Sequence, residues 1–324
     1  MDSLIIIGLV TATLRTATPL VFAGLGGVFS ERAGVVNIGL EGMMVMGAFF
    51  SVYGTYLTGS PLIGILFAIV AGALIALLHA FLSISLKADQ VISGTAINLF
   101  SSALASFLIF KIFKKGGQTD IVKALAYNVP ASAKSIPIIG PILSGINWFV
   151  IIALILVVIS HYVLFKTPVG LRIRAVGEHP KAADTLGINV YKVRYLCVML
   201  SGALAGLGGA ALIGITPVYR EGMVAGRGFI ALAAMIFGNW KPFGTMFACL
   251  LFAFGGSFEI FAQGFSWNLP SEFYSSIPYI LTMLALAGFV GKTTAPAADG
   301  QPYEKNLSLI HISEPTRHSL ISYA

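Results

Sequence analysis

Residues 166–194 read KTPVGLRIRAVGEHPKAADTLGINVYKVR and separate two strongly apolar segments. The stretch contains six cations and two carboxylates: Lys166, Arg172, Arg174, Lys181, Lys192 and Arg194 against Glu178 and Asp184. Pro180 suits the first position of a helix, where no backbone N–H is needed, and Gly187 suits the position just past a helix end. The sequence therefore predicts a basic helix of about two turns, presented for docking between two membrane spans.

The remainder of the chain is dominated by apolar residues. Of 324 residues, 57% are hydrophobic and 10% are charged, whereas soluble domains carry about 25% charged residues. A net charge of +7 could suggest a nucleic-acid partner, but the basic residues lie in loops between apolar runs. This distribution is typical of a protein oriented in a membrane. We therefore expect an all-α polytopic protein in contact with lipid and not with nucleic acid.

A helix that crosses a bilayer needs about 20 largely apolar residues. The first candidate span contains Arg15 and Pro19, so it could be broken, and the seventh is short enough to be tilted or re-entrant. We therefore expect eight or nine spans. The candidates are residues 4–29, 36–58, 61–86, 91–112, 147–165, 195–217, 226–239, 243–263 and 272–290.

Placing the basic stretch on the cytoplasmic side orients the other loops. Residues 30–33, 86–90 and 239–244 then lie on the same side, and 111–147 on the opposite side. The five lysines of 111–147 argue against that placement, but longer loops follow the charge bias less strictly, so we keep this orientation, with the C-terminus in the cytoplasm.

The chain divides by composition near residue 291. Residues 1–291 are expected to form one transmembrane domain, and 292–324 a polar, disordered tail. Within that tail, about 307–324 are interpreted as non-native sequence.

The sequence contains no pattern typical of catalysis. HExxH, paired-carboxylate and Ser-His-Asp patterns are missing. Gly291-Lys292-Thr293 resembles the end of a P-loop, but Leu286 stands where the first glycine is required. We therefore expect no enzyme activity, no cofactor and no metal site.

Glu41 is an ionisable residue inside a predicted span, where a carboxylate is costly and marks a functional or structural polar site. It could lie near a translocation path. Alternatively, it could pair with Arg32 or Arg15, or cap a neighbouring helix. We favour the structural alternative, because burial near a helix end suits pairing.

Two further sets of residues are candidates for the translocation path. Gln90, Ser93 and Asn98 can share one side of a helix, where they could line a path for a hydroxylated solute or bond to other helices. Arg227 and Phe229 begin a segment that could be a half-helix aimed at a solute, or a packed short span. In both sets the two interpretations have similar weight.

Three segments resemble one protein family. They are FSERAGVVNIGLEGMMVMGAF (29–49), LRIRAVGEHPKAADTLGINV (171–190) and GRGFIALAAMIFGNWKPFG (226–244). Together they resemble permease subunits of bacterial ABC importers, in the branched-chain amino acid/monosaccharide permease superfamily. Within it, the simple-sugar and nucleoside branch, especially its purine-nucleoside permeases, is the most similar. The resemblance covers about residues 1–291.

The resemblance implies a type II importer permease fold in the bacterial plasma (inner) membrane, with a cytoplasmic coupling helix that docks on an ATPase. It also implies three partners: a cytoplasmic ABC ATPase (as separate or fused domains), a second, different permease and an extracytoplasmic solute-binding protein. The residues expected to couple to the ATPase are Glu178, His179, Pro180, Lys181, Ala182, Ala183 and Gly187.

The expected function is therefore that of a permease subunit in an ATP-driven importer of nucleosides. A simple sugar or riboflavin stays open as the solute. An ion-coupled secondary transporter is the rival from another class, but it would leave the basic docking stretch unexplained.

Overall fold

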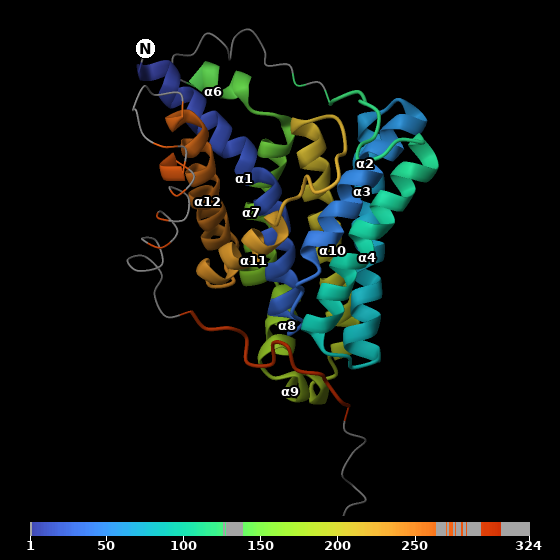
Figure 1. Ribbon diagram of the computed structural model, residues 1–324. Coiled ribbons are helices and arrows are strands. Elements are labelled where there is room, and N and C mark those ends of the chain that lie inside the picture. The colour runs from blue at the N-terminus through green and yellow to red at the C-terminus, as the bar shows by residue number, and fades with distance from the viewer. Residues whose placement is uncertain are drawn as a thin grey trace, which may run out of the picture.

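The computed structural model describes residues 2–125, 127, 139–263 and 293–305, together with 270, 272–274, 276, 280 and 283. These residues form helices and no β-sheet; a single isolated bridge pairs Gln118 with Arg220. Figure 1 shows the long helices side by side, with the shorter ones between them or at the ends. The helices are α1 (Asp2–Arg32), α2 (Leu40–Thr58), α3 (Pro61–Ala80), η1 (Phe81–Ser85), α4 (Gln90–Leu108), η2 (Ile109–Phe113), α6 (Ile139–Gly145), α7 (Trp148–Lys166), α8 (Pro168–Glu178), α9 (Pro180–Thr185), α10 (Val190–Ile215), α11 (Arg227–Phe237) and α12 (Pro242–Ala262).

Within the described residues, six helices are long and apolar enough to cross a membrane. They are α1, α3 extended by η1, α4 extended by η2, α7, α10 and α12. The eight predicted spans before residue 264 each coincide with a helix, and α11 is the short one, as expected. Its 11 residues rise only about 16 Å, roughly half of a bilayer core. The ninth predicted span, 272–290, lies largely outside the described residues.

The centre of the bundle is α10, which packs against α3, α2 and α1. Glycines make these approaches close. A Cβ on Gly202 or Gly206 would overlap the backbone of α3, and a Cβ on Gly209 would overlap the backbone of α2. These small residues allow close packing, because dispersion contacts hold helices together where no water can be released.

Helix α1 continues through Pro19 and shows no break. Proline removes one N–H from the helix, so the alternative of a broken span was reasonable. Hydroxyl groups of the same helix supply extra bonds nearby: Thr16 and Thr18 donate to the carbonyls of Ala12 and Leu14. Packing against α10 and α12 also supports α1.

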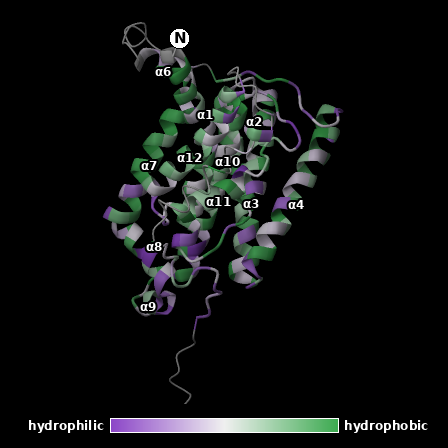
Figure 2. Cartoon of the chain, turned by 60° about the vertical axis from the view of Figure 1, so that its left-hand side comes forward, coloured by the Kyte–Doolittle hydropathy of each residue, from purple (hydrophilic) through white to green (hydrophobic). Residues whose placement is uncertain are grey.

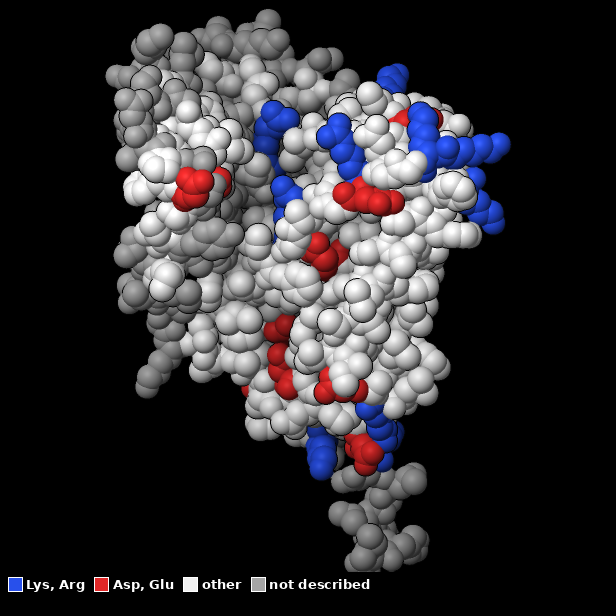
Figure 3. Space-filling view, in the orientation of Figure 1, with Lys and Arg blue, Asp and Glu red and all other residues white. Residues whose placement is uncertain are grey.

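The surface is apolar along the helices and polar at their ends. Figure 2 shows the green, hydrophobic residues along the long helices and purple residues around α8 and α9. In Figure 3 most Lys and Arg side chains gather toward the two ends, and some Asp and Glu side chains lie between them on this face. Large apolar side chains such as Leu62, Leu99 and Phe110 are more than half exposed, as expected for a surface in lipid.

The loops predicted to share the cytoplasmic side lie at one end of the molecule. Figure 1 shows α8, α9, the end of α1 and the α3–α4 connection there, and α6 at the opposite end. The turn after α11 joins the same group, because Arg32 donates hydrogen bonds to the carbonyls of Asn239 and Trp240. We refer to this as the α9 end.

Residues 293–305 lie against the α9 end (Figure 1). The expectation of a disordered tail was wrong for them, because they form hydrogen bonds to α8 and α10. The segment is polar and has no apolar core of its own, which is why its composition indicated disorder. It is ordered because it forms hydrogen bonds to backbone groups and to a buried arginine of the bundle.

Candidate functional site

The element between α7 and α10 consists of two short helices whose ends carry recognisable caps. Pro168 and Pro180 stand at the starts of α8 and α9. Gly187 follows α9 with φ +80° and donates its N–H to Asp184, while Ile188 donates to Ala183. These two bonds make a Schellman motif. The helix predicted from Pro180 and Gly187 therefore forms, with six residues.

Helix α9 is mostly open to solvent. Ala183 is its one buried residue, at 2% exposure, and it packs in a small apolar cluster with Val176, Val190 and Tyr303. The predicted coupling residues Glu178, His179, Lys181, Ala182 and Gly187 are exposed, and Pro180 is half-buried. They lie on the segment of α8 and α9 that connects the spans α7 and α10.

Glu41 binds the start of α11, 185 residues further along the chain. Its Oε1 accepts a hydrogen bond from the N–H of Gly226 at 2.8 Å, and its Oε2 from Gly228 at 2.7 Å. A Cβ on Gly228 would overlap the backbone of Glu41, so the two segments are in direct contact. The structure thus bears out the capping alternative and not pairing with Arg15 or Arg32. Free N–H groups at a helix start attract a carboxylate.

Gln90, Ser93 and Asn98 are buried together around the connection between α1 and α2. Gln90 accepts from the N–H of Val36, and Asn98 accepts from the N–H of Gly42. Asn98 also donates to the carbonyl of Ile38. These side chains therefore bond to other segments of the bundle, which was one of the two interpretations of this polar set. Their direct role on a translocation path stays a prediction.

His79 completes this polar cluster. Its Nε2 lies 3.0 Å from the carbonyl oxygen of Val36, and its Nδ1 lies 3.0 Å from the Ser93 hydroxyl. A carbonyl oxygen only accepts, so Nε2 carries the proton and Nδ1 accepts from Ser93. The connection before α2 is therefore held by side chains of α3 and α4, and α2 in turn holds α11 through Glu41.

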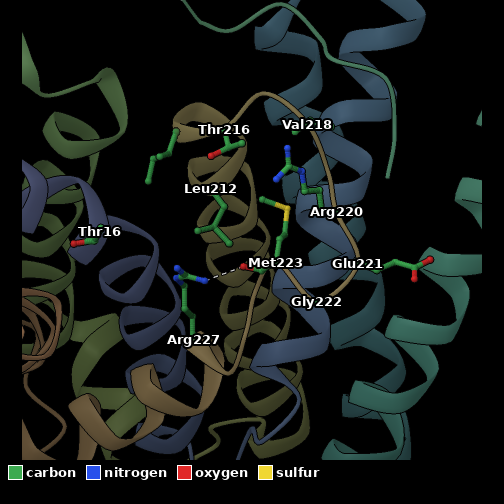
Figure 4. A pocket seen from close by; sticks show the side chains of 10 residues that line it. Thr16, Leu212, Thr216, Val218, Arg220, Glu221, Gly222, Met223 and Arg227 are labelled. Carbon is green, nitrogen blue, oxygen red and sulfur yellow. Dashed lines mark hydrogen bonds between the residues drawn. The ribbon is translucent and has the colours of Figure 1, made fainter. Parts of the chain in front are cut away.

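A cavity of about 370 Å³ lies next to the start of α11, between α1, α10 and the loop that follows α10 (Figure 4). The side chains that line it are Thr16, Leu212, Ile215, Thr216, Val218, Arg220, Glu221, Met223 and Arg227, with Gly222. Figure 4 shows Arg227 reaching back to the carbonyl of Met223, at 2.8 Å. The cavity thus combines two guanidinium groups, two hydroxyls and an apolar wall, and Figure 4 shows the Glu221 side chain pointing away from the other labelled residues.

The structure brings some of the predicted path residues to this cavity and not others. Arg227 lines it, and Glu41 holds the helix that Arg227 begins. Phe229 lies on the outside of α11 with 46% exposure. Sequence reasoning missed Arg220 and Glu221, although a charged pair between two apolar segments is a signal that could have found them.

The described residues contain no group of three His, Cys, Asp or Glu side chains suited to a metal ion. Both cysteines, Cys197 and Cys249, are buried and unpaired.

Comparison with known proteins agrees with this geometry. Residues 9–286 match the family model described as branched-chain amino acid transport system / permease component. The chain is similar to the guanosine ABC transporter permease protein NupQ of Bacillus subtilis (strain 168), with 46% identity over 92% of this chain and 96% of that protein.

Two further relatives are similar along most of their length. The nucleoside ABC transporter permease protein NupC of Lactococcus lactis subsp. cremoris (strain MG1363) shares 44% identity over 92% of this chain and 97% of its own length. The guanosine ABC transporter permease protein NupP of Bacillus subtilis (strain 168) shares 30% over 85% and 78%. The chain is a multi-pass membrane protein that belongs to the family of branched-chain amino acid transport system permease components.

Proposed function

We propose that this chain is a permease subunit of an ATP-driven importer of nucleosides in a bacterial inner membrane. The observation that carries the proposal is its 46% identity to a guanosine permease along nearly the whole of both chains. The exposed, capped helix α9 supports the coupling role, because a rigid element outside the bundle is what a separate ATPase would move. Transport then needs no chemistry on the solute.

The partners follow from this role. A cytoplasmic ABC ATPase would engage α9, and an extracytoplasmic binding protein would deliver the solute to the opposite end. The second permease is proposed to be a different chain, because the sequence is similar both to NupQ and, less closely, to NupP of the same organism. The ATPase domains could be separate chains or fused in one double-length chain.

The cavity between α1 and α10 is the proposed solute site. Its volume of about 370 Å³ falls in the range of small-molecule pockets. Arg220 and Arg227 offer planar donor groups for acceptors on a base edge, and apolar side chains suit the base faces.

The first test is uptake of labelled nucleosides by cells that express this chain with its ATPase, second permease and binding protein. Ribose and riboflavin complete the panel, and each assay is repeated with an inactive ATPase. ATPase-dependent nucleoside uptake is the expected result. Uptake of only another solute would overturn the substrate, and uptake by this chain alone, indifferent to the ATPase, would overturn the transporter class.

Two cavity variants test the solute site within the same assay. Arg220→Ala and Thr216→Val are expected to raise the KM for nucleoside several-fold while the amount of complex stays unchanged, because each removes a polar group from the lining. Lys115→Ala, which changes an exposed lysine outside the cavity lining, is the control. Unchanged KM in both variants would remove the cavity from the solute route.

A further inference from the structure

Residues 293–305, which we call the C-terminal strap, attach to α8 through backbone bonds. Ala298 donates its N–H to the carbonyl of Gly177 at 2.8 Å. Ala297 donates to the carboxylate of Glu178 at 3.2 Å. The carbonyl oxygen of Ala298 lies so close to Gly34, just past α1, that a Cβ there would approach it to 3.0 Å. The strap therefore fills the angle between α8 and the end of α1.

The strap also supplies the partners of a buried arginine on α10. Arg194 is only 1% exposed, and its Nη1 donates to the carbonyl of Gln301 at 2.9 Å. The Nε and Nη2 atoms of Arg194 have no hydrogen-bond partner among the described residues. The Asp299 carboxyl lies close enough to interact with the charge of the Arg194 guanidinium. The Asp299 carboxyl also lies close enough to interact with the Glu31 carboxyl of α1. A buried guanidinium is stable only with such compensation.

The third attachment lies directly under α9. Tyr303 is 5% exposed and is one of the four buried residues in the cluster that holds Ala183. Its ring also contacts the ring of Tyr191 edge-on, at 5.4 Å between centroids, and its carbonyl accepts from the Tyr191 hydroxyl. An isolated helix of six residues is unstable, so α9 depends on this packing.

We propose that the C-terminal strap is the element that makes α9 rigid with respect to α1 and α10. The inference rests on the proposed function, since it gives the strap a role in coupling. Movement imposed on α9 by the ATPase is passed to the transmembrane helices because the strap joins α8, α9, α1 and α10. Without the strap, local unfolding of α9 absorbs that movement.

The attachment of α9 can be measured by thiol labelling. In Ala183→Cys the new thiol is buried, and the two native cysteines are buried as well, so labelling by a bulky maleimide is slow. Removing the strap with a stop codon after Lys292 is expected to speed labelling about tenfold, because α9 opens more often. Ala182→Cys, exposed on the same helix, normalises reagent access.

Transport coupling is measured on the assembled transporter. Tyr303→Ala is expected to leave the complex and its ATP hydrolysis in place but to lower the nucleoside imported per ATP several-fold. Tyr303→Phe, which keeps the ring in the cluster, and Lys305→Ala, at an exposed ion pair 3.8 Å long, are matched controls. Transport per ATP should stay at the level of the unchanged protein in both.

The outcomes separate this inference from the proposed function. Slow labelling of Ala183→Cys and unchanged transport per ATP, in both the strap-less chain and Tyr303→Ala, would overturn the strap's role, even where nucleoside uptake is ATP-dependent. ATP-independent uptake by the unchanged chain would overturn the proposed function instead. If the strap-less chain does not accumulate, Tyr303→Ala, which removes one side chain, decides the question.

Discussion

Helices α9 and α11 are both too short to cross a bilayer, yet they are held in different ways. The ends of α9 are set by its own sequence, Pro180 and Gly187, and its surface is open. The start of α11 is bound by Glu41, a side chain of α2. At the end of the bundle, water can satisfy the backbone groups of a helix terminus, whereas inside the bundle a distant polar side chain has to do so.

The largest effect is expected at α9. Ala183→Arg places a long cation in a cluster of four apolar residues, so α9 has to leave its position. Nucleoside uptake should be abolished while the amount of protein in the membrane stays near that of the unchanged chain. Ala182→Ser, at the exposed neighbouring position, is the control. Normal uptake in Ala183→Arg would show that the position of α9 does not matter for coupling.

The corresponding change at α11 is Glu41→Ala. It leaves the N–H groups of Gly226 and Gly228 without their acceptor and should cost about 3 kcal/mol of stability, since bonds to a charged acceptor are strong. Thermal unfolding of the purified protein in detergent measures this loss. Glu41→Gln keeps one acceptor oxygen and should lose less, with folded yield affected more than solute preference. A clean change of preference at full yield would instead make Glu41 a solute contact.

The contact between α2 and α11 can be probed without touching the carboxylate. Gly228→Ala adds a Cβ that overlaps the backbone of Glu41, so the start of α11 has to move and folded yield should fall. Gly256→Ala on α12 is the matched control, because a Cβ there meets nothing within 4 Å among the described atoms. Equal yields of the two variants would mean that α11 is not seated tightly on α2.

The smallest effect is a pH dependence confined to the α9 end. Burial raises the pKa of Asp299 to about 7, although Glu31 of α1 and Arg194 of α10 act in the opposite direction. A carboxyl whose pKa is raised in the bound state binds best when protonated, so strap attachment weakens as pH rises from about 4 to about 7 and changes little above that.

This dependence is read from the labelling ratio of Ala183→Cys to Ala182→Cys, which cancels the pH dependence of thiol reactivity. The ratio should rise between about pH 5 and pH 7 in the unchanged strap. Asp299→Asn, which cannot ionise, should give a flat ratio. A rise of the same size in Asp299→Asn would assign the pH dependence to another group.

Much of the fold follows from local patterns in the chain. Apolar length located the spans before residue 264, and Pro180 with Gly187 located α9, because both signals act within a few residues. The composition of 226–239 also indicated a helix too short to span. Pro19 indicated a possible break in the first span, but α1 is continuous, since its packing against α10 and α12 outweighs one missing hydrogen bond.

The sequence by itself determined that this is a helical membrane protein with a basic, capped element between two spans, because length, hydropathy and caps are local quantities. Only the tertiary structure decided that Glu41 caps α11, that Arg220 and Glu221 join Arg227 around one cavity, and that the strap holds α9. These are pairings between residues up to about two hundred positions apart. No local pattern encodes them, since they are selected by the need to satisfy each buried polar group when the helices pack.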